Sequence, residues 1–292
     1  MKPLKLIGSW AWRLVVAGAG YAAGMVLGGI AATALGLEPP RSPPSDDPAA
    51  GAMLLLPGGM ALALGLAAMA KGLPGTRWQR WLVLGTFAYV VNGVGTTLEL
   101  SEFSNLGGGP FSLVLNLPAS YLCALLVVAL FRASPAAGLA DTTSVFSLPP
   151  VALAGRLLLA FLAFPVLYFV FGMLVAPIVL PHYEQIDFII VPPLGTILFL
   201  VACRSVLFLL VTVPVIVRWG LSRGRLAVAL ATGHFAAVGL CGLVQAQWFP
   251  PVLRWTHGVE ILATSVVYGA VLAWLLFPVP RAPAAAAAAG DA

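Results

Sequence analysis

The chain has 292 residues, of which 61% are hydrophobic and only 9% are charged, whereas about a quarter of the residues are charged in ordinary soluble chains. This composition excludes a water-soluble globular protein, because most of the surface must face lipid. The net charge of +5 requires no nucleic-acid partner, since it follows from where the basic residues lie between the apolar segments. We therefore expect a multi-pass membrane protein whose surroundings are membrane lipid.

Apolar runs of about 20 residues, the length that spans a bilayer, occur eight times along the chain. Clusters of proline and glycine separate several of them, as expected where a chain leaves the membrane. The predicted fold class is an all-α integral membrane protein with eight transmembrane helices in one membrane domain over residues 1–281. The alanine-rich tail 282–292 has no apolar anchor, so we expect it to be disordered. The predicted helices are Leu14–Leu35, Ala52–Ala70, Trp81–Leu98, Phe111–Phe131, Leu157–Leu180, Leu194–Val217, Leu226–Gln245 and Thr256–Phe277.

The basic residues predict the orientation, because cytoplasmic loops carry an excess of Lys and Arg. With a cytoplasmic N-terminus, twelve of the fifteen basic residues lie on the cytoplasmic side, two on the other side, and Arg204 within a helix. Both termini are then cytoplasmic, in a membrane of the bacterial inner-membrane type. The twelve are Lys2, Lys5, Arg13, Lys71, Arg77, Arg80, Arg132, Arg156, Arg218, Arg223, Arg225 and Arg281, and the two are Arg41 and Arg254.

The first predicted helix has two interpretations. Lys2 and Lys5 before an apolar stretch that ends in Ala32-Thr33-Ala34 resemble a cleavable secretory signal. The stretch is longer than the 7 to 15 residues typical of such signals, which favours a retained helix. Three glycines recur every four residues on one face of it, and such spacing lets another backbone approach closely. We expect this face, formed by Gly20, Gly24 and Gly28, to pack on a neighbouring helix or to form an oligomer contact.

The two halves of the chain, 1–133 and 151–281, share short identities. Arg13-Leu14 is echoed by Arg156-Leu157, and Phe87-Ala88 by Phe235-Ala236 at an offset of 148 residues. Four helices in each half would make the repeats parallel, an arrangement found in some transporters. A duplication and a chance resemblance in a biased composition are both compatible with these identities.

Arg204 is the most informative polar residue within a predicted helix. It lies ten residues after Leu194, about 15 Å into a hydrocarbon core about 30 Å thick. A cation at that depth should face the interior of the bundle and have a partner, or it should join helices. We expect Glu260, about 6 to 8 Å below the outer surface, to be this partner.

His257 and Glu260 are three residues apart and therefore share one face of the last predicted helix. A histidine and a carboxylate so placed can relay protons, bind a metal or hydrogen-bond to each other. Two ligands on one helix are weak support for a metal, because a third would have to come from elsewhere. We predict no metal, and no motif predicts a cofactor.

Two further helices carry polar side chains at helical spacing. Asn92, Thr96 and Glu99 lie on one face of the third predicted helix, although Glu99 is near enough to its end to be in water. His234 and Gln245 occur in the seventh helix, where His234 is expected to be neutral and bonded to a neighbouring helix. These residues, with Arg204, His257 and Glu260, predict a polar pocket that opens outward.

The predicted function is the handling or transport of a small solute, since a bundle with few loops and interior charge suits a pathway. One alternative is a membrane-embedded enzyme acting on a lipid or a lipid-linked substrate, with Glu260 or Glu99 as the general acid or base. A non-catalytic assembly or sensor protein is the second alternative. The sequence does not distinguish the three by any catalytic motif.

Overall fold

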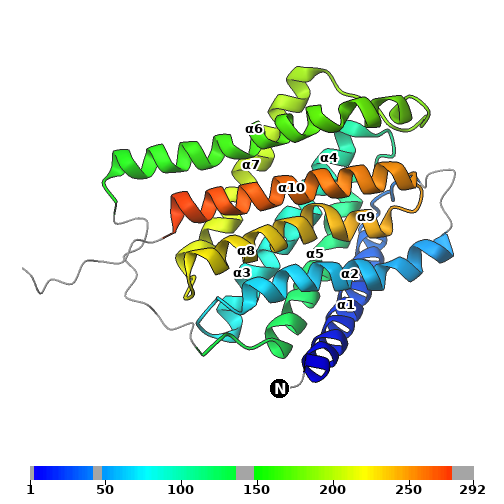
Figure 1. Cartoon of the computed structure of the whole chain (residues 1–292). Helices are drawn as coiled ribbons and strands as arrows, with labels where there is room; N and C mark the ends of the chain where they lie inside the picture. The colour runs from blue at the N-terminus through cyan, green and yellow to red at the C-terminus, as the bar shows by residue number, and fades with distance from the viewer. Residues whose placement is uncertain (1–2, 42–47, 136–147, 278–292) are drawn as a thin grey trace, which may run out of the picture.

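The structure is a computed structural model that describes residues 3–41, 48–135 and 148–277 (Figure 1). The described residues form helices and no strand; Ser104 and Ile189 pair in a single antiparallel bridge. Eight helical segments in these ranges are long and apolar enough to cross a membrane. The tail 282–292 lies outside the described residues, so the prediction made for it stays a prediction.

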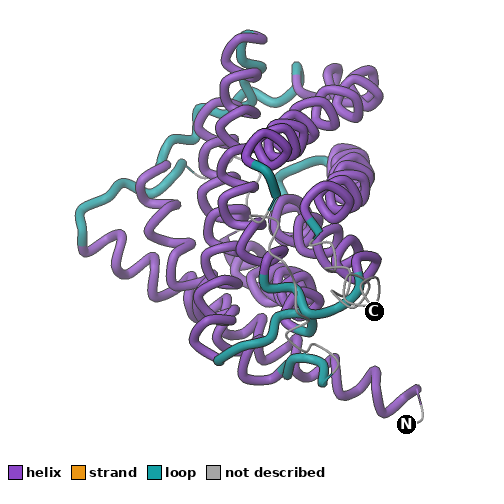
Figure 2. The backbone as a smooth tube through the Cα atoms, turned by 90° about the vertical axis from the view of Figure 1, so that its left-hand side faces the viewer, coloured by secondary structure: helices purple, strands orange, loops and turns teal. Residues whose placement is uncertain are grey.

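The helices form one bundle and are joined mostly by short connections in the described ranges (Figure 2). Two of the membrane-crossing segments are each divided by a π-helix, so twelve helical elements build the eight segments. The elements are α1 (Pro3–Ala34), α2 (Pro48–Ala70), α3 (Arg77–Ala88), η1 (Tyr89–Val94), α4 (Gly95–Phe103), α5 (Gly109–Leu130), α6 (Pro150–Tyr183), α7 (Leu194–Val217), α8 (Arg223–His234), η3 (Phe235–Leu240), α9 (Cys241–Gln245) and α10 (Pro251–Leu276).

Several helices begin or end elsewhere than predicted, and α3 and α6 are two examples. α3 begins at Arg77 rather than at Trp81, because Thr76 and Gln79 form a capping box. The backbone N–H of Gln79 donates to Thr76 Oγ1 at 3.3 Å, and that of Thr76 donates to Gln79 Oε1 at 3.2 Å. α6 extends at both ends beyond the predicted Leu157–Leu180 and reaches Tyr183, which the hydropathy pattern had assigned to a loop.

α1 and α5 pack closely through the predicted glycine face. A Cβ atom at Gly24 would overlap the backbone of Ala119, and one at Gly28 would overlap the backbone of Leu115. Glycine allows this approach because it has no side chain to hold the backbones apart. The face considered for an oligomer contact is therefore covered by α5 of the same chain.

α6 is the least enclosed of the membrane-crossing helices that the structure describes. Only 11% of its most apolar window is buried, against 33% or more in each of the others. It lies at one edge of the bundle, and α1 lies at the other (Figure 1). Consistent with this position, Gly172 has no atom within 4 Å of where its Cβ would be. α6 thus forms a lipid-facing wall, and its inner face borders the site described below.

One end of the bundle, which we call the basic end, gathers basic side chains around the ends of helices. Arg80 donates to the carbonyl oxygens of Ala70 and Phe131 at 2.9 and 2.8 Å, and Arg156 donates to that of Leu275 at 3.0 Å. These carbonyls close α2, α5 and α10, so the arginines satisfy groups that a helix end leaves unpaired. The opposite end includes the connections 35–41, 104–108, 184–193 and 246–250.

Candidate functional site

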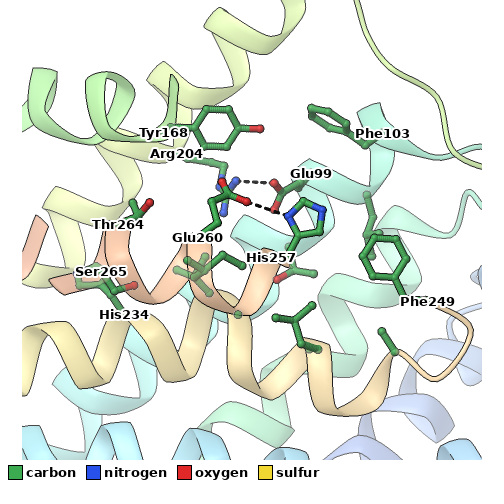
Figure 3. Close-up of a pocket in the computed structure, with 18 of the residues that line it drawn as sticks. Glu99, Phe103, Tyr168, Arg204, His234, Phe249, His257, Glu260, Thr264 and Ser265 are labelled. Carbon is green, nitrogen blue, oxygen red and sulfur yellow. Dashed lines mark hydrogen bonds and ion pairs between the residues drawn. The ribbon is translucent and has the colours of Figure 1, made fainter. Parts of the chain in front are cut away.

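A cavity of about 400 Å³ lies towards the opposite end, between α4, α6, α7, α10 and the segment from α8 to α9. Its walls are mainly apolar and aromatic, and four ionisable side chains lie in it besides His234 and three tyrosines (Figure 3). A concave, mostly apolar pocket with a few convergent polar groups is the usual form of a small-molecule site. The four side chains are Glu99, Arg204, His257 and Glu260.

Arg204 forms an ion pair with Glu99. The prediction that Glu260 is its partner is wrong. Arg204 Nη1 lies 2.9 Å from Glu99 Oε1, and the side chains are 3% and 35% exposed. The guanidinium also lies over the rings of Phe164 and Phe208, at 5.7 and 5.4 Å from their centroids. The cation is thus held by one carboxylate and two aromatic faces, which together offset the cost of burying it.

Glu99 was not predicted as the partner because the third predicted helix ends at Leu98, whereas the structure continues it through the π-helix η1 and through α4 to Phe103. A π-helix is equivalent to one extra residue in an α-helix, so the residues after it turn by about 100° around the axis. Glu99 follows η1 on α4, and α4 contacts α7, which carries Arg204. A regular helical projection of Asn92, Thr96 and Glu99 is therefore wrong across this segment.

Glu260 is bound to His257, and the bonded chain continues to α6. Glu260 Oε2 accepts from His257 Nδ1 at 2.8 Å, and His257 Nε2 lies 2.7 Å from the hydroxyl of Tyr183. Neutral His257 with its proton on Nδ1 satisfies both contacts, since Nε2 then accepts the Tyr183 hydroxyl proton. A carboxylate that orients an imidazole, which in turn contacts a hydroxyl, is an arrangement able to move a proton.

The other predicted site residues divide into two groups. Thr96, His234 and Gln245 border the cavity, together with the four ionisable residues. Asn92 does not; its side chain is buried and interacts with Tyr21 of α1. His234 is bonded to a neighbouring helix, as predicted, because its Nε2 lies 3.2 Å from Thr212 Oγ1 on α7.

The inner end of the cavity contains polar atoms without a partner. Arg204 Nε, His234 Nδ1 and the Tyr268 hydroxyl are buried and make no hydrogen bond to any described residue. All three side chains border the cavity and are at most 2% exposed. Buried polar groups are costly when unpaired, so these atoms are suited to bind polar groups of a molecule that enters the cavity.

Sequence reasoning missed Tyr183 and Phe249. Both rings lie beside the imidazole of His257, at 6.0 and 5.7 Å between centroids and nearly parallel to it. Tyr183 was missed because α6 continues past Pro181, a residue that usually marks a helix end. Phe249 belongs to a short connection, and nothing in the pattern indicated that its ring turns inward.

Neither His257 nor Glu260 belongs to a group of three metal-ligating side chains in the described ranges. The geometry instead provides one closed ion pair, one hydrogen-bonded relay and a set of unpaired polar atoms around an apolar cavity. Comparisons with family models, with curated proteins and with solved structures find no match to this chain.

Proposed function

We propose that the protein binds a small solute in this cavity and carries it across the membrane. The observation that supports this most is the ion pair of buried Arg204 with the partly exposed Glu99, in a cavity that extends from the opposite end to Tyr268 on the interior side of α10. Ionisable groups within a membrane bundle are costly and mark solute or proton pathways. The apolar and aromatic walls supply binding energy, and the few polar groups supply selectivity.

The proposal also covers the orientation of the chain in the membrane and the type of membrane that holds it. Lys71, Arg80, Arg156 and Arg218 lie at the basic end, and the positive-inside rule places that end in the cytoplasm. The cavity then lies in the outer half of a plasma membrane of the bacterial type. A solute from outside would reach Glu99, whose side chain is the most exposed of the ion pair, before it reached Arg204.

The proposal also includes a duplication, which two features of the structure support. η1 and η3 each have six residues and each follow an α-helix of 12 residues, and the two π-helices begin 146 residues apart, so the offset of 148 that aligned Phe87-Ala88 with Phe235-Ala236 is wrong by two residues. The separation of 146 residues also relates Glu99 to Gln245 and Gly58 to Arg204. Glu99 contacts Arg204, and the side chain of Gln245 lies against Gly58.

The packing of the two halves follows the same correspondence. α1 packs on α5 as α6 packs on α10, and the two π-containing segments pack on α5 and α10 in turn. Tyr21 and Asn92 of the first half are buried and do not border the cavity, whereas Tyr168 and Arg204 of the second half do. In this proposal the two halves offer two equivalent positions, and only the one that contains Arg204 became the solute site.

Thiol labelling tests the transport proposal. Cys123, Cys203 and Cys241 are replaced, and Thr264→Cys is introduced in the cavity wall. We expect a membrane-impermeant thiol reagent to label this cysteine from outside in right-side-out vesicles. A pathway must open to each face in turn, so the cysteine should also be labelled in inside-out vesicles. A cysteine at Glu102, which is exposed and does not line the cavity, is the control and should be labelled from one side only.

A second candidate function is a membrane enzyme. The hydrogen-bonded chain Glu260–His257–Tyr183 favours it, because such a chain can act as a general base. The same labelling experiment distinguishes this enzyme from a transporter. An enzyme needs access from one side only. Labelling of Thr264→Cys from one face only therefore contradicts transport and leaves the enzyme. No labelling from either face, while the control reacts, contradicts both.

A further inference from the structure

We infer that the cavity is selective for a small organic cation, an ammonium group that carries a hydrogen-bonding substituent. This inference rests on the proposed function and adds the chemical class of the solute. Its basis is the balance of charge in the cavity, the orientation of the aromatic rings and the unpaired polar atoms at the inner end.

The charge balance leaves one carboxylate without a cation. The charge of Arg204 is matched by Glu99 at 2.9 Å. His257 donates from Nδ1 to Glu260, which requires no charge on the imidazole, and its second nitrogen lies against the Tyr183 hydroxyl. Among the described residues the cavity therefore holds two carboxylates, Glu99 and Glu260, and one permanent cation, Arg204, and a cationic solute would supply a second. An anion would have to displace Glu99 from Arg204 and approach Glu260 at the same time.

Aromatic rings line the cavity near this carboxylate. Tyr183 and Phe249 lie beside the imidazole of His257 and beside each other, and Phe103 lies near Glu99 (Figure 3). The face of an aromatic ring attracts a cation within about 6 Å of its centre. The site already uses this attraction for its own cation, since Arg204 lies over Phe164 and Phe208. The same chemistry suits an ammonium group near Glu260.

The volume of the cavity and the polar atoms at its inner end indicate the size of the solute and its second functional group. A cavity of about 400 Å³ is near the lower limit of small-molecule sites, about 300 to 1,000 Å³, which favours a small solute over a two-chain lipid. His234 Nδ1 and the Tyr268 hydroxyl are unpaired among the described residues and border the inner end. A hydroxyl or carbonyl group on the solute would pair with them.

Three molecules of similar shape test the class: choline, the uncharged 3,3-dimethylbutan-1-ol and the anion 3,3-dimethylbutanoate. Binding to the full chain in lipid nanodiscs is measured by titration calorimetry. We expect choline to bind about tenfold more tightly than the alcohol, since a desolvated cation–π contact and an ion pair contribute about 1.4 kcal/mol or more. The carboxylate should bind most weakly.

Glu260→Gln should weaken choline binding about tenfold and leave the alcohol unchanged, because it removes a charge and keeps the shape. Glu184→Gln is the matched control, since Glu184 is exposed at the same end and does not border the cavity. Equal binding of choline and the alcohol, tighter binding of the carboxylate, no binding of choline, or no effect of Glu260→Gln overturns the inference. The thiol labelling decides separately whether the proposed function stands, because it requires no particular solute.

Discussion

Arg204 and Glu99 form an ion pair whose two members have very different surroundings. The guanidinium is almost completely buried between Phe164 and Phe208, whereas about a third of the Glu99 side chain is exposed. Removal of the carboxylate leaves a buried cation without a counter-charge, which is the more costly way to break such a pair. Removal of the cation leaves a carboxylate that can turn towards solvent.

A double-mutant cycle on Glu99→Gln and Arg204→Met tests this pair. We expect a coupling energy between about 0.5 and 3 kcal/mol, as for residues in direct contact, from the free energies of unfolding of the four proteins in detergent. The matched cycle on Glu260→Gln and Arg204→Met should give a much smaller coupling, since Glu260 is bonded to His257. Stronger coupling to Glu260 than to Glu99 would show that the pairing is wrong.

The residues of the site were predictable from the sequence, but their partners were not. Arg204, His257 and Glu260 stand out because charge within an apolar run is costly and needs a reason. The choice between Glu99 and Glu260 for Arg204 depends on the continuation of the helix past Leu98 and on the rotation of α4 after η1, and hydropathy does not report a π-helix. Tyr183 and Phe249 carry no such signal, because aromatic residues are common near the ends of membrane helices.

Among the elements, α1 and α6, which correspond to each other in the proposed duplication, differ in their packing. α1 meets α5 through glycines that allow backbone contact, while Gly172 of α6 has open space around it. The existence of both helices followed directly from the length of their apolar runs. Their different packing did not, because glycines occur in both and only the partner helix determines whether a glycine is needed.

Gly24→Leu and Gly172→Leu form a matched pair of substitutions at the element scale. Gly24→Leu should destabilise the protein by about 1 to 3 kcal/mol or more, since a side chain there overlaps the Ala119 backbone. Gly172→Leu should change the stability by less than about 0.5 kcal/mol, because nothing lies within 4 Å of the new Cβ. Thermal unfolding in one detergent measures both. Equal losses would contradict the close packing of α1 on α5.

For the whole molecule, the basic residues and the number of apolar segments lead to one topology. Eight membrane-capable segments lie in the described ranges, and hydropathy alone was enough to predict them. With all eight crossing the membrane, the proposed topology has both ends of the chain on one side. The two π-helices, which separate α3 from α4 and α8 from α9, were not predictable. The apolar pattern runs through both segments without interruption.

Reporter fusions check this topology. Fusions after Gly108 and after Gln185, both in connections at the opposite end, should be active only with a reporter that functions outside the cytoplasm. Fusions after Arg132 and after Arg223, at the basic end, should be active only with a cytoplasmic reporter. A cytoplasmic signal from either of the first two would reverse the assigned direction of the cavity.

The two π-helices also bear on the order of events in the history of the chain. A π-helix is equivalent to a one-residue insertion, and here the insertions occur at matching positions, directly after α3 and α8. If the halves descend from one ancestral segment, the insertion is older than the duplication, since the alternative requires two independent insertions at the same place. The substitution that made the equivalent positions differ, arginine at 204 and glycine at 58, then came after the duplication. Descendants of the same ancestor should keep both π-helices even where the arginine is missing.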